Sequence, residues 1–114
     1  MVPKTVCGKM NYIAPEVLNT DIRVVDPMFC DIWSLGIVLF ICLTGLPPMD
    51  QAIPADERFR KICYDSDLAD MLTGWGMGHL LTPEVVDLIQ GILKEDPELR
   101  PSIAQIRSHA WFRL

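Results

Sequence analysis

The feature that most constrains the fold of this chain is its longest stretch without a charged residue, the 18 residues Ile32–Met49. A helix that is apolar on every face either crosses a membrane or lies at the centre of a large protein. Composition sharpens the question, because 50% of the 114 residues are hydrophobic and the mean hydropathy is +0.24. So many apolar residues are hard to bury in so short a chain. They indicate a membrane segment, a large interface or a part of a larger fold.

The ends of this stretch favour a buried helix over a membrane span. Gly45 and the prolines after it stop a helix near Thr44, which leaves about 13 helical residues, or roughly 20 Å. The hydrocarbon core of a bilayer is about 30 Å thick. Asp31 and Asp50 flank the stretch, and no Lys or Arg stands beside either end as an anchor. We therefore predict a central buried helix over residues 31–45 and no membrane span.

Charge and cysteine content exclude further classes. The chain has 10 basic and 15 acidic residues, a net charge of −5, without a run of Lys or Arg, so no nucleic-acid partner is expected. The 4 cysteines are widely and irregularly spaced, so we predict no metal site and an intracellular, cytoplasmic protein without a signal peptide. Inside the apolar stretch, Cys42 is predicted to be a buried free thiol, and Ser34 to bond back to its own helix.

The rest of the pattern is helical, and we predict an all-α chain with an irregular beginning and outer helices within residues 55–114. A short helical turn is expected with Pro15 at its first position. The further helices are predicted at 50–66, at 67–75 with Asp67 as N-cap, at 82–94 with Thr82 as N-cap and Pro83 first, and after the capping box Ser102–Gln105. In the last helix, Ile103, Ile106 and Ala110 would form the apolar stripe.

Several motifs follow one another in a fixed order. They are Ala14-Pro15-Glu16, Asp31-Ile32-Trp33-Ser34-Leu35-Gly36, Asp96-Pro97-Glu98-Leu99-Arg100-Pro101-Ser102 and the closing His109-Ala110-Trp111-Phe112. They resemble the Ala-Pro-Glu that closes the activation segment of protein kinases, the opening of the kinase F helix, the loop with the family's late arginine, and the end of the catalytic domain. The sequence thus resembles the C-terminal part of the large lobe of a serine/threonine protein kinase, of the calmodulin-dependent-kinase-like group.

This resemblance implies a partial protein kinase domain over residues 1–114. Residues 1–16 would be the end of the activation segment with the substrate loop, and helices equivalent to F, G, H and I would follow. Glu16 would pair with Arg100, the alternative being two unrelated surface charges. Asp31 would accept hydrogen bonds from the backbone of the catalytic loop, or cap the helix that follows it. The other structural positions implied by the motifs are Ala14, Pro15, Trp33 and Gly36.

The resemblance also implies a substrate-binding loop. Its positions are Val6, Cys7, Gly8, Lys9, Met10, Tyr12 and Ile13. Val6, Met10 and Ile13 would line a small apolar pocket for the substrate residue that follows the phosphoacceptor. Thr5 stands where many kinases carry the activating phosphate, the alternative being an unmodified loop threonine.

Two positions depart from the family pattern. Lys9 stands where serine/threonine kinases usually have a threonine, and an ammonium group there would alter the basicity of the catalytic aspartate. Ile41 stands where kinases that select arginine place an acidic residue, so no strong arginine preference is implied. Tyr12 still favours the serine/threonine branch over the tyrosine branch.

The motifs that hold ATP and its metal do not occur in these 114 residues: no phosphate-covering glycine loop, strand lysine, catalytic-loop Asp and Asn, or Asp-Phe-Gly. The resemblance implies ATP and Mg for the complete kinase, and protein substrates or other kinases as partners. For this chain it implies no cofactor and no catalytic residue. We predict an inactive kinase fragment or, alternatively, a half-lobe that docks proteins through residues 7–16 and 58–63. We also expect marginal stability, because part of the surface of helix 32–43 would lack partners.

Overall fold

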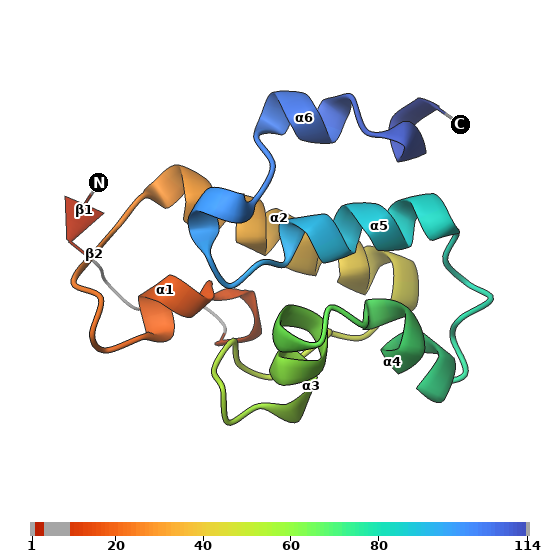
Figure 1. The fold of residues 1–114 in the computed structure, drawn as a ribbon, viewed down its shortest axis with the longest axis horizontal. Helices are drawn as coiled ribbons and strands as arrows, with labels where there is room; N and C mark the ends of the chain where they lie inside the picture. The colour runs from red at the N-terminus through yellow and green to blue at the C-terminus, as the bar shows by residue number, and fades with distance from the viewer. Residues whose placement is uncertain (1, 4–9, 114) are drawn as a thin grey trace.

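The fold is seen in a computed structural model, which describes residues 2–3 and 10–113 (Figure 1). Its elements are β1 (Val2–Pro3), the 3-10 turn η1 (Met10–Tyr12), α1 (Pro15–Leu18), β2 (Val24–Val25), α2 (Pro27–Thr44), α3 (Glu57–Phe59), the π-helical turn η2 (Arg60–Tyr64), α4 (Leu68–Gly74), α5 (Pro83–Ile92), the 3-10 turn η3 (Pro97–Leu99), α6 (Ile103–Arg107) and the 3-10 turn η4 (Ala110–Arg113). The paired strands β1 and β2 have two residues each. The predicted all-α class is therefore confirmed.

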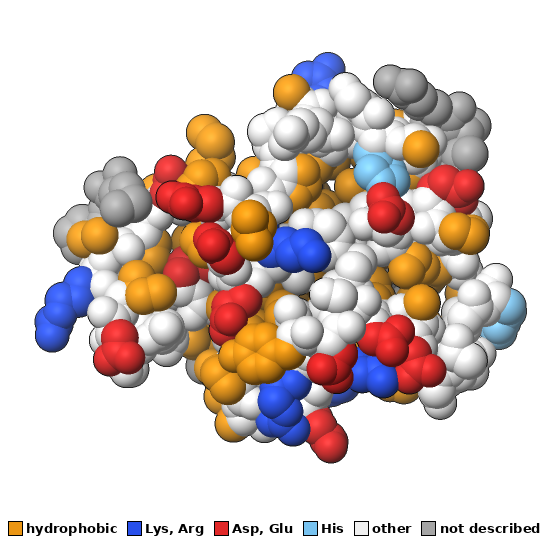
Figure 2. All heavy atoms as spheres, viewed as in Figure 1, with side chains coloured by type: hydrophobic (Ala, Val, Ile, Leu, Met, Phe, Trp, Pro, Cys, Tyr) orange, Lys and Arg blue, Asp and Glu red, His pale blue; other side chains and the backbone are white. Residues whose placement is uncertain are grey.

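Helices α2 and α5 lie side by side through the middle of the molecule, with α3 and α4 on one side of them and α6 on the other (Figure 1). Acidic side chains gather over α4 and again where α1 approaches η3, as the net charge of −5 leads one to expect (Figure 2). Helix α2 thus contacts η1 from the beginning of the sequence and α5 and η3 from its later part. It is the element that positions the candidate site.

The central helix α2 begins one turn before its predicted start. Asp26 is its N-cap and accepts a hydrogen bond from the Met28 N–H at 2.9 Å, and Pro27 takes the first helical position. The prediction of Asp31 as a cap was wrong, because this residue lies inside the helix with an exposed side chain. The predicted end is confirmed, since Gly45 adopts a left-handed conformation (φ 80°) after Thr44.

Because α2 starts earlier than predicted, its length has to be compared again with the thickness of a membrane. With 18 residues, α2 is about 27 Å long. By length and composition alone it could cross a membrane, with a mean hydropathy of 1.9 over those residues. The prediction that the helix is too short was therefore wrong, and the packing of its side chains is the more informative property.

One face of α2 forms the core. Trp33, Ile37 and Phe40 are fully buried, and the helix packs against the apolar face of α5. Gly36 permits this close packing, because a Cβ there would lie 2.5 Å from the Cγ2 atom of Ile92. The predicted stripe on α5 is confirmed: its buried residues are Val85, Leu88, Ile89 and Ile92.

The opposite face of α2 is not covered by the described residues. Leu35 is 40% exposed, Val38 is 42% exposed, and Cys42 is also exposed. We call these three residues the uncovered face. They follow the i, i+3, i+7 spacing of one helix side, so Cys42 points away from the core, and its predicted burial was wrong. The expectation that part of this helix lacks partners is confirmed.

The outer helices α4, α5 and α6 begin at the N-cap residues predicted from the sequence. Asp67 caps α4 through the Asp70 N–H, and Thr82 caps α5 through the Val85 N–H. Pro83 takes the first position of α5, as predicted. The capping box between Ser102 and Gln105 at the start of α6 is also confirmed.

Two helix predictions were wrong. Instead of one helix over 50–66, a loop leads to Asp56, which starts α3 and then η2. Burial acts to raise the pKa of Asp56, but hydrogen bonds from four backbone N–H groups prevail and lower it. In α6 only Ile106 is buried, whereas Ile103 is 48% exposed and Ala110 is exposed. The stripe fails because α6 ends at Arg107, so the helical period does not reach Ala110.

Candidate functional site

The centre of the candidate site is an ion pair between residues 84 positions apart in the sequence. The Arg100 Nη1 and Nη2 atoms donate to the Glu16 Oε2 and Oε1 atoms, each at 2.7 Å. The side chain of Arg100 is 0% exposed and that of Glu16 is 5% exposed. The ion pair expected from the motifs is thus present, buried and bidentate, the geometry that fixes orientation as well as distance.

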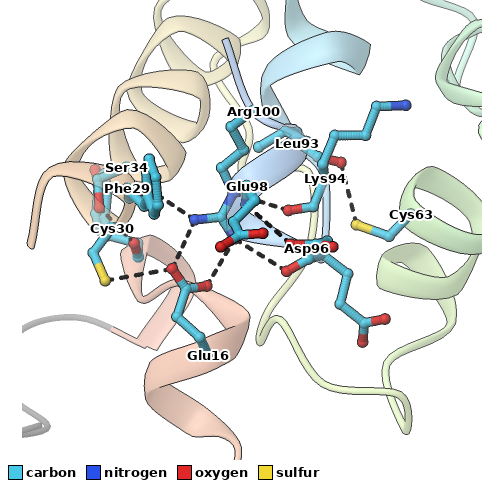
Figure 3. Close-up of polar contacts among 12 residues, drawn as sticks. Glu16, Phe29, Cys30, Ser34, Cys63, Leu93, Lys94, Asp96, Glu98 and Arg100 are labelled. Atoms are coloured by element: carbon cyan, nitrogen blue, oxygen red, sulfur yellow. Dashed lines mark hydrogen bonds and ion pairs between the residues drawn. The ribbon is translucent and has the colours of Figure 1, made fainter. Parts of the chain in front are cut away.

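The guanidinium group of Arg100 has five N–H donors, and all of them have partners. Besides the two bonds to Glu16, Nη1 donates to the Phe29 carbonyl at 2.9 Å, Nε to the Lys94 carbonyl at 2.9 Å and Nη2 to the Glu95 carbonyl at 3.3 Å (Figure 3). The group also lies 5.1 Å from the ring centroid of Trp33, a cation–π distance. We call Glu16, Arg100, Trp33 and these three carbonyls the hub.

The hub joins three distant segments of the chain. Glu16 lies in α1, Phe29 and Trp33 in α2, and Arg100 directly after η3. Pro15 starts α1 with its fixed φ and thereby sets the position of Glu16. A buried ion pair is costly unless its remaining donors and acceptors are satisfied, and here they are, so the arrangement holds the segments in one geometry.

Cys30 is a hub neighbour that the sequence analysis missed. Its thiol donates to the Glu16 Oε2 atom at 3.5 Å (Figure 3). Burial, and then the negative charge of Glu16, raise the pKa of this thiol to about 12. Cys30 is therefore a protonated donor and an unreactive thiol. The residue directly precedes the Asp31 motif, but nothing about a lone cysteine in the sequence signals this contact.

A second link ties the end of the predicted substrate loop to α2. The Ser34 Oγ atom donates to the Tyr12 carbonyl at 2.9 Å. The predicted bond from Ser34 to its own helix was wrong, because its side chain lies beside the loop that precedes α1. Ile13 is 8% exposed and Ala14 is 2% exposed, so this part of the loop belongs to the core. Tyr12 is half-buried and packs against the same core.

The remaining predicted positions separate into three groups. Trp33 and Gly36 are buried on the core face of α2, while Asp31 is exposed on α2, and its proposed partner, the catalytic loop, is not in this chain. Residues Thr5, Val6, Cys7, Gly8 and Lys9 lie outside the described residues, as does the side chain of Met10. The predicted apolar pocket therefore stays a prediction.

The chemistry of the hub is positional. Both carboxylate oxygens of Glu16 accept hydrogen bonds from Arg100, so this carboxylate is used to hold the arginine in place. Within residues 2–3 and 10–113, no group of three His, Cys, Asp or Glu side chains could hold a metal ion. What the hub does in the structure is to hold α1, α2 and the segment after η3 together.

Comparison with known proteins agrees with this geometry. The protein kinase domain family matches residues 2–112. The chain is 36% identical over 111 residues to CBL-interacting protein kinase 1 of Oryza sativa subsp. japonica, covering 96% of this chain and 21% of the relative. It is 36% identical over 114 residues to the ovarian-specific serine/threonine-protein kinase Lok of Drosophila melanogaster, covering 98% of this chain and 22% of the relative.

The family is thereby established: this chain belongs to the protein kinase domain family. Its relatives are serine/threonine kinases, which confirms the resemblance drawn from the motifs. The chain spans about a fifth of the length of the curated relatives it matches. The hub residues Glu16 and Arg100 and the core residue Trp33 are all within the matched region.

Proposed function

We propose that this chain is the C-terminal part of the large lobe of a serine/threonine protein kinase of the calmodulin-dependent-kinase-like group. The complete protein would transfer the γ-phosphoryl group of ATP to serine or threonine in protein substrates. The observation that supports this most is the bidentate Glu16–Arg100 pair, which joins the end of the proposed activation segment to α2 and to the turn after α5. In this proposal the pair would hold the loop in the position in which it binds substrate, because a bidentate pair fixes orientation as well as distance.

In this proposal the chain alone is inactive. Phosphoryl transfer depends on positioning and neutralising the nucleotide and its metal. The sequence lacks the motifs that do so, and the described residues hold no cluster of metal ligands. ATP and Mg therefore do not fit the residues of this chain and belong to the proposed complete kinase, which would act inside the cell.

The roles of the loop before α1 rest on the resemblance. Residues 7–14 would form the platform for the substrate residue that follows the phosphoacceptor, and Val6, Met10 and Ile13 would line a small apolar pocket there. Thr5 would be the site of an activating phosphate. The buried positions of Ile13 and Ala14 support this assignment, because they hold the end of the loop against α2.

A second function is favoured by one observation. The described end of the loop is fixed by the Ser34–Tyr12 bond and by the hub, and both lie entirely within this chain. A platform held in this way is preorganised for docking a protein even without catalytic parts. The alternative is therefore a non-catalytic half-lobe that binds substrates or other kinases.

A phosphotransfer assay tests the first proposal. The purified 114-residue chain is incubated with γ-labelled ATP, MgCl2 and a mixture of casein and histone, with a full-length kinase as the positive control. We expect no transfer above background. Metal-dependent labelling that survives repurification of the chain would contradict the proposal.

Sequencing the transcript upstream of Met1 distinguishes the two functions. In-frame His-Arg-Asp and Asp-Phe-Gly motifs support the kinase, because they supply the parts that this chain lacks. A start of transcription downstream of any such motif supports the docking half-lobe.

A further inference from the structure

A groove that the kinase assignment does not explain lies beside the hub. It has a volume of about 460 Å3 and is walled by residues 15–16, 18–20, 22, 52–54 and 95–97. Cavities that bind ligands are typically about 300–1,000 Å3. None of residues 10–14, the described part of the proposed substrate loop before α1, is among the residues that line it. We call it the acidic groove, because Glu95 and Asp96 are among its lining residues.

The floor of the acidic groove is apolar and only half covered. Leu18, Ile22 and Ile53 contribute to it from two separate segments, and all three side chains are half-buried. Apolar groups that are partly exposed in a concave site gain free energy when a ligand completes their burial. An aliphatic side chain of a partner is the group that suits this floor.

The rim of the groove is acidic. Glu95 and Asp96 line it with exposed side chains, and no Lys or Arg is among the residues that line it. The third carboxylate of the lining, that of Glu16, is neutralised by Arg100 at the back of the groove. Figure 2 shows acidic side chains gathered where α1 approaches η3. The field at the mouth therefore favours a cationic group.

The walls of the groove are already fixed. Each of the three segments contributes a proline, Pro15, Pro54 and Pro97, whose φ is locked by its ring. The Pro54 carbonyl also accepts a hydrogen bond from the Arg60 Nη1 atom at 2.6 Å. Pro15 adjoins the hub, and Pro97 starts η3. A site whose walls do not have to order on binding retains more of the interaction free energy.

From these observations we propose that the acidic groove docks a short, basic peptide segment of a partner protein. One aliphatic side chain of that segment lies on the floor formed by Leu18, Ile22 and Ile53. An arginine or lysine beside it faces Glu95 and Asp96. The occupant is a peptide of a partner rather than a second copy of this chain, because the chain is itself acidic, with a net charge of −5.

Fluorescence anisotropy tests the proposal with a defined probe, a fluorescein-labelled peptide of sequence Gly-Arg-Arg-Leu-Arg-Arg-Gly. The full chain is fused to maltose-binding protein to keep it in solution, and the fusion partner alone is the blank. We expect saturable binding that weakens when NaCl is raised, because exposed charges are screened by salt. A peptide with serine in place of leucine, and one with glutamine in place of arginine, should each bind more weakly.

Variants assign the binding to the groove. The pair Glu95→Gln and Asp96→Asn, which keeps the cap of η3, should weaken binding about fivefold and remove most of the salt dependence. Ile53→Ser should weaken it about tenfold, since it removes part of the floor. The matched control is Glu84→Gln with Glu98→Gln, which removes two charges outside the groove and should leave the affinity unchanged. Thermal unfolding of each variant verifies that the fold is retained.

Three outcomes would overturn the proposal. They are the absence of saturable binding, equal binding by the groove variants and the charge control, and a concentration-dependent dimer that Ile53→Ser abolishes while the peptide does not bind. The last result would assign the groove to contact between two copies of the chain. None of these outcomes depends on phosphotransfer, so the proposed kinase function is tested separately.

Discussion

The two faces of α2 differ in how far their apolar side chains are buried. On one face Trp33, Ile37 and Phe40 are fully buried, and Trp33 lies under the guanidinium of Arg100. On the other face Leu35 and Val38 are 40% and 42% exposed, although they are as apolar as their neighbours. The same helix therefore belongs to a completed core on one side and to an uncompleted one on the other.

The two faces of α2 indicate different things about the function of the chain. The completed face includes the hub, where a buried charge pair has every donor satisfied and distant segments are fixed. The uncovered face has the composition of a core but the exposure of a surface, as expected for part of a larger domain. The chain spans about a fifth of its curated relatives, which agrees with that interpretation. Substitutions on the two faces should therefore have very different effects.

The largest effect is expected at the hub. Arg100→Ala should lower the free energy of unfolding by about 3–5 kcal/mol, because it leaves the buried carboxylate of Glu16 without its partner. Arg58, which pairs at 2.9 Å with Asp50, whose side chain is exposed, is the matched control. Arg58→Ala should cost about 0.2–1 kcal/mol. Urea titration followed by Trp fluorescence measures both, and similar losses would contradict the distinction.

Adjacent residues of α2 give the next comparison. Ile37→Ala should cost about 2–5 kcal/mol, because it leaves a cavity in the packed core. Val38→Ala should change stability by less than about 0.5 kcal/mol, since Val38 is 42% exposed and its truncation leaves no enclosed cavity. The same urea titration compares them. Equal losses at both positions would show that the uncovered face is buried in solution.

Two glycine-to-alanine substitutions compare the effect of adding one methyl group at a tightly packed position and at an open one. Gly36→Ala should cost about 1–3 kcal/mol, because its Cβ would meet Ile92 at 2.5 Å and Leu93 at 3.1 Å. Gly91→Ala, in α5, has nothing within 4 Å of the added Cβ and should stabilise the chain by about 0.4–1 kcal/mol. Thermal midpoints that shift in the same direction for both variants would count against the close packing of α2 on α5.

The reactivity of the cysteines towards a thiol reagent compares the uncovered face with buried parts of the protein, without any substitution. Cys42 is exposed on the uncovered face, whereas burial raises the pKa values of Cys30 and Cys63 to about 12. A rise from 9.0 to about 12 reduces the thiolate fraction at pH 8 by about a thousandfold, and the thiolate is the reactive form. Iodoacetamide followed by peptide mass spectrometry should therefore label Cys42 before Cys30 and Cys63. Faster labelling of Cys30 would contradict the geometry of the hub.

The same shifts give the sign of a pH effect. Because the folded state holds the thiol protons more tightly than the unfolded state, these thiols contribute stability that is fully present below pH 9 and is lost as the pH rises towards about 12. Urea titrations across this range should show a falling free energy of unfolding. The double variant Cys30→Ala and Cys63→Ala should show a smaller slope over the same range.

Much of this architecture follows from local sequence signals. Thr82 before Pro83, and Ser102 with Gln105, mark helix starts that the structure confirms. The same signal stands at Asp26 and Pro27. The predicted start of α2 was misplaced because it was derived from the charge-free stretch and not from this signal. Sequence motifs also identified Glu16 and Arg100, because each lies in a recognisable pattern.

Other features depend on tertiary contacts that sequence spacing does not contain. The bond from Ser34 to the Tyr12 carbonyl and the contact of Cys30 with Glu16 arise from how loops pass beside α2. The exposure of Cys42 depends on which helix face has neighbours, and periodicity cannot supply this for a helix that is apolar all round. The hub could be predicted as a pair but not as a set of five satisfied donors.

The central claim is that Glu16 and Arg100 act as one unit, and a double-mutant cycle tests it most directly. The free energies of unfolding of Glu16→Gln, Arg100→Gln, the double variant and the parent chain are measured by urea titration. We predict that the loss of free energy of unfolding in the double variant is smaller than the sum of the two single losses by about 2 kcal/mol or more. The reason is that each single change leaves a buried partner unsatisfied. Single losses that add within about 0.5 kcal/mol would contradict the claim.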